Sequence, residues 1–581
     1  MFLKEWQKIV LLIFGSFVFA GLILRIFFGS FTAAPPPVME NSYLELVVGG
    51  DIPERSAEDP LLETIGESAI LSVEQLLQAI RKARIDDNIT GMILRPFPST
   101  MGWGKTGEIR NALLAFRAAG KPIYAYLDAA GDKEYYLASA ADSIIGPATG
   151  ILLVNGFASE ALFFKGTLDK LGIEADFVAH GKYKNAPDTY TRKEMSDAQR
   201  EVINALLDQF YATLLDTIAA TRSLDRGSVQ DYVDRGFTSV AAARQAGLID
   251  TLMYYYEMKD FLKARQDDDL NFVSLSSYRD APPAGDEWNA RESIAVVYGV
   301  GTIVTGGKSQ YGNGLITSEG MADAIRQAAR DSEIKAIILR IDSPGGSGSA
   351  SDVIWREVVE ARKEKPVIVS ISDMAASGGY YISMAADSII AHPNSIVGSI
   401  GVYAGKFSWK GLYDKIDLNQ EKNLRGRHAD IFSESSKFSP SQREVVRKFI
   451  MEFYEDFIEK VAEGRHMSVE EVDRIAQGRV WTGRQGLEIG LVDKLGDFTT
   501  AVEVAKNMAG IPQEQKVRLK VYPHLKTLLE RFFGRSVTVK ASDVLPQLLD
   551  LPPEMRYTLN ALPHFQEGEP LFLWVDWMGI R

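Results

Sequence analysis

One long segment occurs twice in this chain, and this internal duplication limits what the sequence can fold into. Residues 126–145, "YLDAAGDKEYYLASAADSII", return as residues 371–390, "ISDMAASGGYYISMAADSII". At the same offset, residues 79–95, "AIRKARIDDNITGMILR", return as residues 324–340, "AIRQAARDSEIKAIILR". A repeat of this length predicts two copies of one domain, each able to bury its own hydrophobic core.

Both copies, which span roughly residues 44–250 and 294–493, have the pattern of an α/β fold. Short apolar runs such as "AIILRI" and "PVIVSI" are typical of strands buried on both faces, and they alternate with helical stretches such as "MADAIRQAARD". Two tandem α/β domains are therefore expected. The predicted limits are 41–265 for the N-terminal repeat, 266–290 for a linker, 291–505 for the C-terminal repeat and 506–581 for a C-terminal extension.

An apolar segment near the N-terminus predicts a membrane anchor. Residues 9–28 are apolar or small except for Arg25, and about 20 helical residues at about 1.5 Å each span the roughly 30 Å of a bilayer core. Lys4 and Lys8 precede the segment, which favours a cytoplasmic N-terminus with the body of the protein on the other side. A signal peptide that is later removed is the alternative. We predict that residues 1–40 form a transmembrane helix and a proline-rich spacer.

Composition disfavours several functional classes. The net charge of −13 argues against a general nucleic-acid binder, because such proteins concentrate Lys and Arg against phosphates. The chain has no cysteine, which rules out disulfides and thiolate zinc sites, and its six histidines form no HExxH motif. We therefore expect no metal, no cofactor and no nucleic-acid partner.

Two glycine-rich stretches of the second copy have the residues of a hydrolase site. "RIDSPGGSGSA" follows one predicted strand and "AASGGYY" follows another. Ser377 would stand at a helix N-terminus, where the Gly378 N–H is available to a developing oxyanion. The turn at Gly345 and Gly346 would supply a second donor. The alternative is that Ser377 only caps the helix, a common role for serine.

The first copy lacks these features and offers a different one. Asp132 stands at the position of Ser377, and "PFPSTMGWG" replaces the Pro-Gly-Gly turn. A serine hydroxyl needs a proton acceptor, and Lys184 in "VAHGKYKNAPDTY" faces Ala429 when the glycines of the two copies are aligned. One copy has the serine without the lysine and the other has the lysine without the serine, which predicts one composite site. His180 is the alternative base.

Four motifs give the chain a specific resemblance to a known family: "DSPGGS", "AASGGYY", "GSIGV" and "GKYKNA". The chain resembles the signal peptide peptidase A family, also called protease IV, in its long, duplicated, membrane-anchored form. That family belongs to the wider Clp protease and crotonase-like superfamily, so two tandem Clp protease/crotonase-like domains are implied. The resemblance also implies Ser377 as nucleophile, Lys184 as general base, Gly346 and Gly378 as oxyanion donors, and Ser399 as a residue that helps to hold the lysine amine.

The resemblance implies a function as well. It is that of a membrane-anchored serine endopeptidase, without metal or cofactor, that degrades cleaved signal peptides and other apolar peptides. The family implies a homotetramer on the periplasmic face of the bacterial inner membrane. Two alternatives remain at this point: a crotonase-like acyl-CoA enzyme, whose similar glycine turns stabilise a thioester enolate, and a non-catalytic membrane scaffold.

Overall fold

Both copies of the duplicated segment are included in the structure, a computed structural model. The described residues are 37–55, 71–266, 269–281, 290–307, 314–523, 565, 570–573 and 579–580. The predicted transmembrane segment, residues 9–28, lies outside them, so the anchor stays a prediction. Within the described ranges, no helix is both long enough and apolar enough to cross a bilayer.

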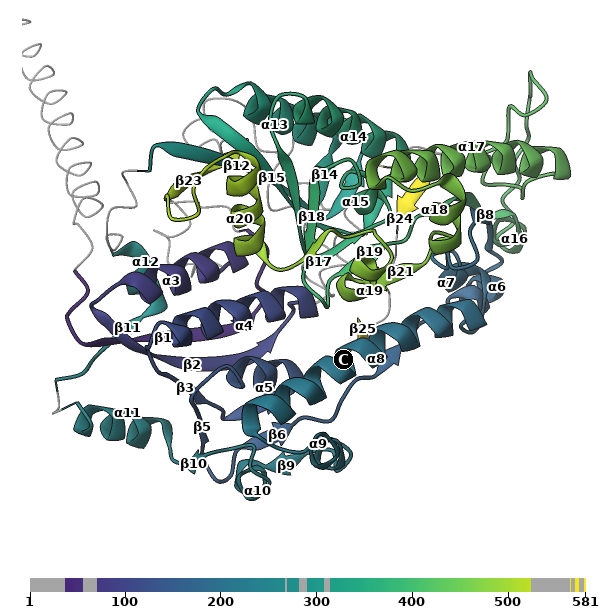
Figure 1. Cartoon of the computed structure of the whole chain (residues 1–581). Coiled ribbons are helices and arrows are strands. Elements are labelled where there is room, and N and C mark those ends of the chain that lie inside the picture. The colour runs from purple at the N-terminus through teal and green to yellow at the C-terminus, as the bar shows by residue number, and fades with distance from the viewer. Residues whose placement is uncertain are drawn as a thin grey trace, which may run out of the picture.

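The first copy is built on a six-stranded sheet in the order β10-β5-β3-β2-β1-β11, whose strands pair in parallel (Figure 1). Parallel neighbours require crossover connections, and helices between the strands supply them. The strands are β1 (Ser42–Gly50), β2 (Ile89–Ser99), β3 (Ile123–Tyr126), β5 (Ser143–Gly146), β10 (Thr251–Leu252) and β11 (Asn271–Ser274). The helices are α3 (Val73–Ile85), α4 (Trp103–Ala118), α5 (Asp132–Ala138), α8 (Asp197–Arg222), α9 (Arg226–Val233), α10 (Val240–Gln245), α11 (Tyr255–Ala264) and α12 (Leu275–Asp280). A small sheet of β4 (Ala129–Gly131), β6 (Ile151–Leu153) and β9 (Thr238–Ser239) lies beside α5.

The second copy repeats this plan in the order β22-β18-β17-β15-β12-β23. In addition, β19 pairs with the last residues of β17, and β21 pairs antiparallel with β19. The strands are β12 (Glu292–Val300), β15 (Ile334–Ser343), β17 (Val367–Ala376), β18 (Ser388–Ala391), β19 (Ile396–Gly398), β21 (Val480–Thr482), β22 (Lys494–Leu495) and β23 (Val517–Tyr522). The helices are α13 (Ser318–Arg330), α14 (Gly348–Arg362), α15 (Gly378–Tyr381), α16 (Lys410–Lys415), α17 (Pro440–Arg465), α18 (Val469–Ile475), α19 (Gly483–Glu488) and α20 (Phe498–Met508). The prediction of two tandem α/β domains is therefore confirmed.

The edge strands extend the duplication beyond the predicted limits. β11 pairs in parallel with β1, and β23 pairs in parallel with the corresponding strand β12. The linker prediction, 266–290, is wrong for β11 and α12, because Leu275 and Tyr278 of α12 are buried in the core of the first copy. The predicted C-terminal extension, 506–581, likewise contributes β23 to the second sheet. These edge strands are short and only half-buried, so they lack the long apolar run that marks a central strand. The other predicted limits stay predictions.

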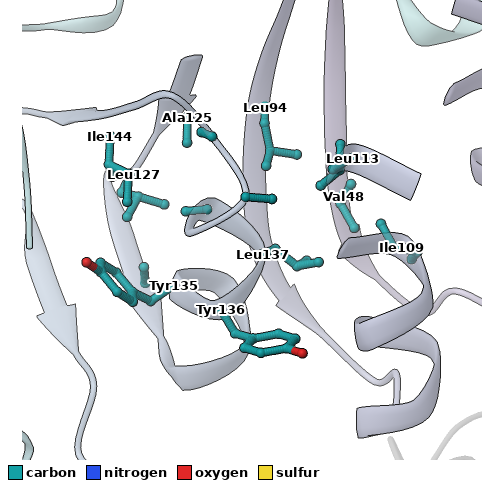
Figure 2. Close-up of a cluster of buried hydrophobic side chains, with 14 of the residues drawn as sticks. Val48, Leu94, Ile109, Leu113, Ala125, Leu127, Tyr135, Tyr136, Leu137 and Ile144 are labelled. Carbon is teal, nitrogen blue, oxygen red and sulfur yellow. The ribbon is translucent and has the colours of Figure 1, made fainter. Parts of the chain in front are cut away.

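Each copy has one large hydrophobic core, to which the other copy contributes a few residues: Ile396 and Val480 pack in the first core, and Val178 packs in the second. In Figure 2, side chains of α4, of α5 and of the first sheet meet in the core of the first copy. One polar contact inside it is repeated in the second copy: the Tyr135 hydroxyl donates to the Leu248 carbonyl at 2.7 Å, and the Tyr380 hydroxyl donates to the Leu491 carbonyl at 2.9 Å. The duplication has therefore preserved buried hydrogen bonds as well as the apolar pattern.

A third sheet joins the two copies. Its order is β14-β13-β16-β24-β20-β8. β8 (Glu174–His180) of the first copy pairs antiparallel with β20 (Val402–Ser408) of the second over seven residue pairs. The remaining strands are β13 (Thr302–Val304), β14 (Leu315–Thr317), β16 (Gly345–Ser347) and β24 (Leu571–Leu573). This sheet brings the segment that follows β8 against the second copy, and α6 (Lys165–Leu171) and α7 (Asp188–Thr191) lie beside β8 (Figure 1).

Candidate active site

Ser377 occupies a strained turn between β17 and α15. Its backbone has φ 53° and ψ −111°, a conformation that residues other than glycine rarely adopt. The residue is fully buried, and its side chain makes no capping hydrogen bond to α15. The alternative in which Ser377 only caps a helix is therefore wrong, because the hydroxyl points to a different partner.

That partner is Lys184. The lysine follows β8 in the first copy, and its Nζ lies 2.7 Å from Ser377 Oγ. The same Nζ lies 3.1 Å from Ser399 Oγ and donates to the Ser399 carbonyl at 3.2 Å. The structure thus brings the predicted serine, the predicted lysine and Ser399 together within a single chain.

Burial controls the charge of this lysine. Lys184 is only 4% exposed, and burial lowers the pKa of its ammonium group well below the ordinary value. Removal from water disfavours the charged form of an amine. A neutral amine within hydrogen-bond distance of a hydroxyl can accept the proton of that hydroxyl.

A loop of the second copy holds Lys184 in place. The Tyr183 N–H donates to the Gln477 carbonyl at 2.7 Å, and the Gly478 N–H donates to the Ile400 carbonyl at 2.8 Å. A Cβ on Gly478, where φ is +76°, would lie 2.6 Å from the Lys184 backbone nitrogen. This close approach requires glycine. Gly478 is not among the residues that the sequence predicts for the site, although the glycine in "AQGRV" is a possible signal of such a contact.

We expect Gly478→Ala to lower kcat by about 10-fold to 100-fold, because a displacement of roughly 1 Å at a catalytic group has effects of that size. The control is Gly510→Ala. Gly510 has a similar φ of +67°, but a Cβ there would meet nothing within 4 Å. Both variants place alanine at a positive φ, but only Gly478→Ala also displaces Lys184. Steady-state kinetics and thermal melting of both variants therefore separate the displacement of Lys184 from the backbone strain. Equal kcat values for the two variants would show that contact with Lys184 is irrelevant.

The two glycine turns of the second copy lie against each other. A Cβ on Gly379 of α15 would lie 2.7 Å from the Ser343 carbonyl oxygen, and a Cβ on Gly346 would lie 2.0 Å from the Ile303 carbonyl oxygen. Ser343 Oγ donates to the Gly301 carbonyl at 2.6 Å and accepts from the N–H of Gly345, which has φ +103°. The turn that contains Gly345 and Gly346 is thereby fixed beside the start of α15.

Gly378 is the first residue of α15, so its N–H has no acceptor within that helix. It adjoins Ser377 directly. An N–H at a helix start beside a nucleophile is suitably placed to stabilise a developing oxyanion.

The other predicted candidates occupy different surroundings. The His180 ring packs on Tyr454, with ring centroids 4.2 Å apart, whereas Lys184 is the group beside Ser377. In the first copy, burial raises the pKa of Asp132 to about 7, and its carboxylate accepts from the Gly156 N–H at 3.3 Å. In the first copy, the position that corresponds to Ser377 therefore holds the carboxyl group of Asp132, which is hydrogen-bonded to the backbone.

Two tandem α/β domains with a buried serine on a strained strand-to-helix turn define a hydrolase of the serine class. A sequence model of peptidase family S49 matches residues 115–268 and 360–512, one match in each copy. The chain belongs to this family, and it is a serine protease. The predicted family resemblance is confirmed.

Several relatives are similar over most of the chain. Serine protease SPPA, chloroplastic, of Arabidopsis thaliana is 36% identical over 461 residues, which cover 77% of this chain and 67% of that protein. Protease 4 of Salmonella typhi is 33% identical over 524 residues, which cover 87% of this chain and 82% of that protein. Protease 4 of Haemophilus influenzae is 32% identical over 481 residues, which cover 79% of this chain and 77% of that protein.

Proposed function

We propose that this protein is a membrane-anchored endopeptidase with a Ser377–Lys184 catalytic dyad, and that it degrades cleaved signal peptides and other apolar peptides. The observation that carries the proposal is the 2.7 Å separation between Lys184 Nζ and Ser377 Oγ at a buried position. Membership of a serine peptidase family disfavours the acyl-CoA enzyme and the scaffold.

The reaction begins with proton transfer. Neutral Lys184 takes the Ser377 proton as the oxygen attacks the carbonyl carbon of the substrate peptide. Ser399 orients the amine, because its hydroxyl and carbonyl oxygens both lie within hydrogen-bond distance of Nζ. The Gly346 and Gly378 N–H groups stabilise the oxyanion.

Lys184 next protonates the leaving amine, and an acyl-enzyme remains on Ser377. A water molecule then enters, Lys184 removes its proton, and attack on the ester releases the carboxylate product. Each step uses the same amine alternately as base and acid. Burial suits this double role, since it brings the pKa of the ammonium closer to the working pH.

The location and assembly form part of the proposal. Residues 9–28 would anchor the chain in the bacterial inner membrane with the catalytic body in the periplasm, where apolar signal peptides are left after secretion. The family resemblance supports a homotetramer. Such an arrangement would concentrate the enzyme where its apolar substrates are released.

A fluorophosphonate probe tests the nucleophile. We expect a covalent adduct on Ser377 in the wild-type protein and no adduct in Ser377→Ala, because only an activated hydroxyl displaces fluoride. Peptide mass mapping locates the label. Ser388→Ala is the matched control, since Ser388 is also buried but lies on the neighbouring strand β18, and it should label normally. A wild-type adduct at another serine, or none, would refute the assignment.

A further inference from the structure

Three consecutive residues of the second copy enclose the loop that carries Lys184. The Gln477 carbonyl accepts the Tyr183 N–H at 2.7 Å, and Gly478 packs against the Lys184 backbone. The third residue, Arg479, takes no part in the proton transfers, yet its side chain is only 17% exposed. A cation that is largely removed from water needs compensating contacts. The contacts of Arg479 therefore indicate what it does.

The Arg479 side chain contacts the first copy at two points. Its guanidinium forms an ion pair with Glu201 of α8 and lies 5.0 Å from the ring centroid of Tyr183. The Tyr183 hydroxyl donates to the same carboxylate at 3.1 Å. The guanidinium also lies 4.3 Å from the ring centroid of Trp481 in β21, the strand that contacts α8 (Figure 1). Because a guanidinium is planar, it can stack on aromatic rings while it pairs with a carboxylate.

The Arg479 backbone contacts Ser399, the residue that orients the lysine amine. The Arg479 carbonyl accepts the Ser399 N–H at 2.7 Å. Ser399 has φ 53°, a value that residues other than glycine rarely adopt, and such a conformation persists only when the surrounding structure holds it. One residue therefore contacts both the loop that carries the base and the serine beside its amine.

Lys182 is a second cation beside Glu201, but its surroundings differ. Its side chain is 62% exposed, and its Nζ lies 3.5 Å from the carboxylate. Exposed ion pairs contribute little to stability, because water and salt screen them. Arg479 is therefore the cation that holds Tyr183 and Glu201 against the second copy. The titratable groups around the loop are Lys182 on the loop itself, His180 on β8, Asp188 on α7, Glu201 on α8, Asp473 on α18 and Arg479.

We propose that Arg479 is a positioning residue for the Ser377–Lys184 dyad, and that its side chain keeps the lysine loop packed against the second copy so that water does not reach the amine. This inference rests on the proposed function. Burial is the cause of the lowered Lys184 pKa. When the guanidinium is removed, the loop loosens, the amine gains hydration, and its pKa rises toward the ordinary value. A smaller fraction of the amine is then neutral, so less of the enzyme can accept the serine proton.

The pH profile of kcat for full-length protein in detergent, with an apolar peptide, tests this role. For Arg479→Met we expect the acid limb to move to higher pH by about one unit, which is a loss of about tenfold in kcat below both midpoints. Above the new midpoint, kcat should return toward the wild-type value. Arg479→Lys keeps the charge without the planar group, so it should shift the limb in the same direction. This milder variant also carries the test if Arg479→Met does not fold.

Arg443→Met is the matched control. Arg443 of α17 also pairs with an acid of the first copy, the buried Asp176 of β8. The variant should lower the melting temperature, because it leaves a buried carboxylate without its cation. It should keep the wild-type acid limb, since Asp176 belongs to the strand and not to the lysine loop.

The outcomes separate this inference from the proposed function. An acid limb at the wild-type midpoint or at lower pH in the Arg479 variants, or an equal shift in Arg443→Met, would overturn the positioning role and leave the dyad intact. A loss of kcat that is uniform across pH would also overturn it, because the charge of Lys184 would then be unaffected. If wild type neither cleaves the peptide nor reacts with the fluorophosphonate at Ser377, the proposed function itself fails.

Discussion

Lys184→Met is expected to lower kcat for peptide cleavage by about 10²-fold to 10⁴-fold, since positioned proton transfer supplies acceleration of about that size. The amine lies 2.7 Å from Ser377 Oγ, and methionine fills a similar volume without a basic atom. Steady-state kinetics with an apolar peptide measure the loss. Lys182→Met is the matched control. Lys182 is 62% exposed and pairs with Glu201 at the surface, so that variant should keep wild-type kcat.

The pH dependence gives a second test of the same residue. Burial lowers the pKa of Lys184, and only the neutral amine accepts a proton. In the wild type, kcat should therefore fall as the pH is lowered through this pKa, by about tenfold per pH unit below it. The residual activity of Lys184→Met should lack that acid limb. An unchanged acid limb in the variant would assign the titration to another group.

Stability measurements test whether Lys184→Met remains folded. The pKa of Lys184 is lower in the folded chain than in the unfolded chain, so the unfolded chain binds an extra proton between the two values. The stability of wild type relative to Lys184→Met should rise with pH up to about 10.4, the ordinary lysine value. At neutral pH the variant should melt at or above the wild-type temperature. If Lys184→Met were both inactive and unfolded, its loss of kcat would report unfolding and not the loss of proton transfer.

Arg340→Met is expected to lower the free energy of unfolding by about 3–5 kcal/mol, because it removes one partner from a buried ionic cluster. Arg340 of β15 is 1% exposed, and its guanidinium lies 2.5 Å from carboxylate oxygens of both Glu54 and Glu108. Both glutamates belong to the first copy. The variant would leave two buried carboxylates without their cation at the junction of the copies. Urea unfolding measures the loss.

The duplication supplies the control for this variant. Arg95 occupies the equivalent position in the first copy, but its side chain is 27% exposed and pairs with Asp128 at 3.3 Å. Surface ion pairs contribute about 0–1 kcal/mol, so Arg95→Met should have a small effect. If the two variants lost the same free energy of unfolding, burial of the ionic cluster would not be the reason for the loss in Arg340→Met.

The loss in Arg340→Met should also depend on pH. Burial already raises the pKa of the Glu108 carboxyl group in the folded chain, and loss of the Arg340 guanidinium should raise it further. A raised carboxyl pKa destabilises the folded chain at high pH, and the penalty disappears as the pH falls toward the unfolded value of about 4.3. The deficit relative to wild type should therefore shrink between about pH 8 and about pH 5. Adding Glu54→Gln and Glu108→Gln should recover part of the loss at pH 8.

Much of the candidate site could be predicted because equivalent positions of the two duplicated copies can be compared within one chain. Ser377 facing Asp132, and Lys184 facing Ala429, indicated which residues each copy had kept. Gly478 was missed, because a glycine that permits a close approach resembles any turn glycine until its neighbour is known. Edge strands β11 and β23 were also missed, since their pairing with β1 and β12 depends on partners far away in the sequence.

The sequence by itself determined the two α/β copies and the residue types of the site, because apolar periodicity and turn glycines are local properties of a chain. Only the tertiary structure decided that Lys184 and Ser377, 193 positions apart, meet within one chain. The pairing of β8 with β20 brings them together, and the burial that lowers the lysine pKa comes from both copies. The proximity of the Lys184 amine to the Ser377 hydroxyl and the desolvation of that amine depend on atoms from distant segments, so no local sequence pattern predicts them.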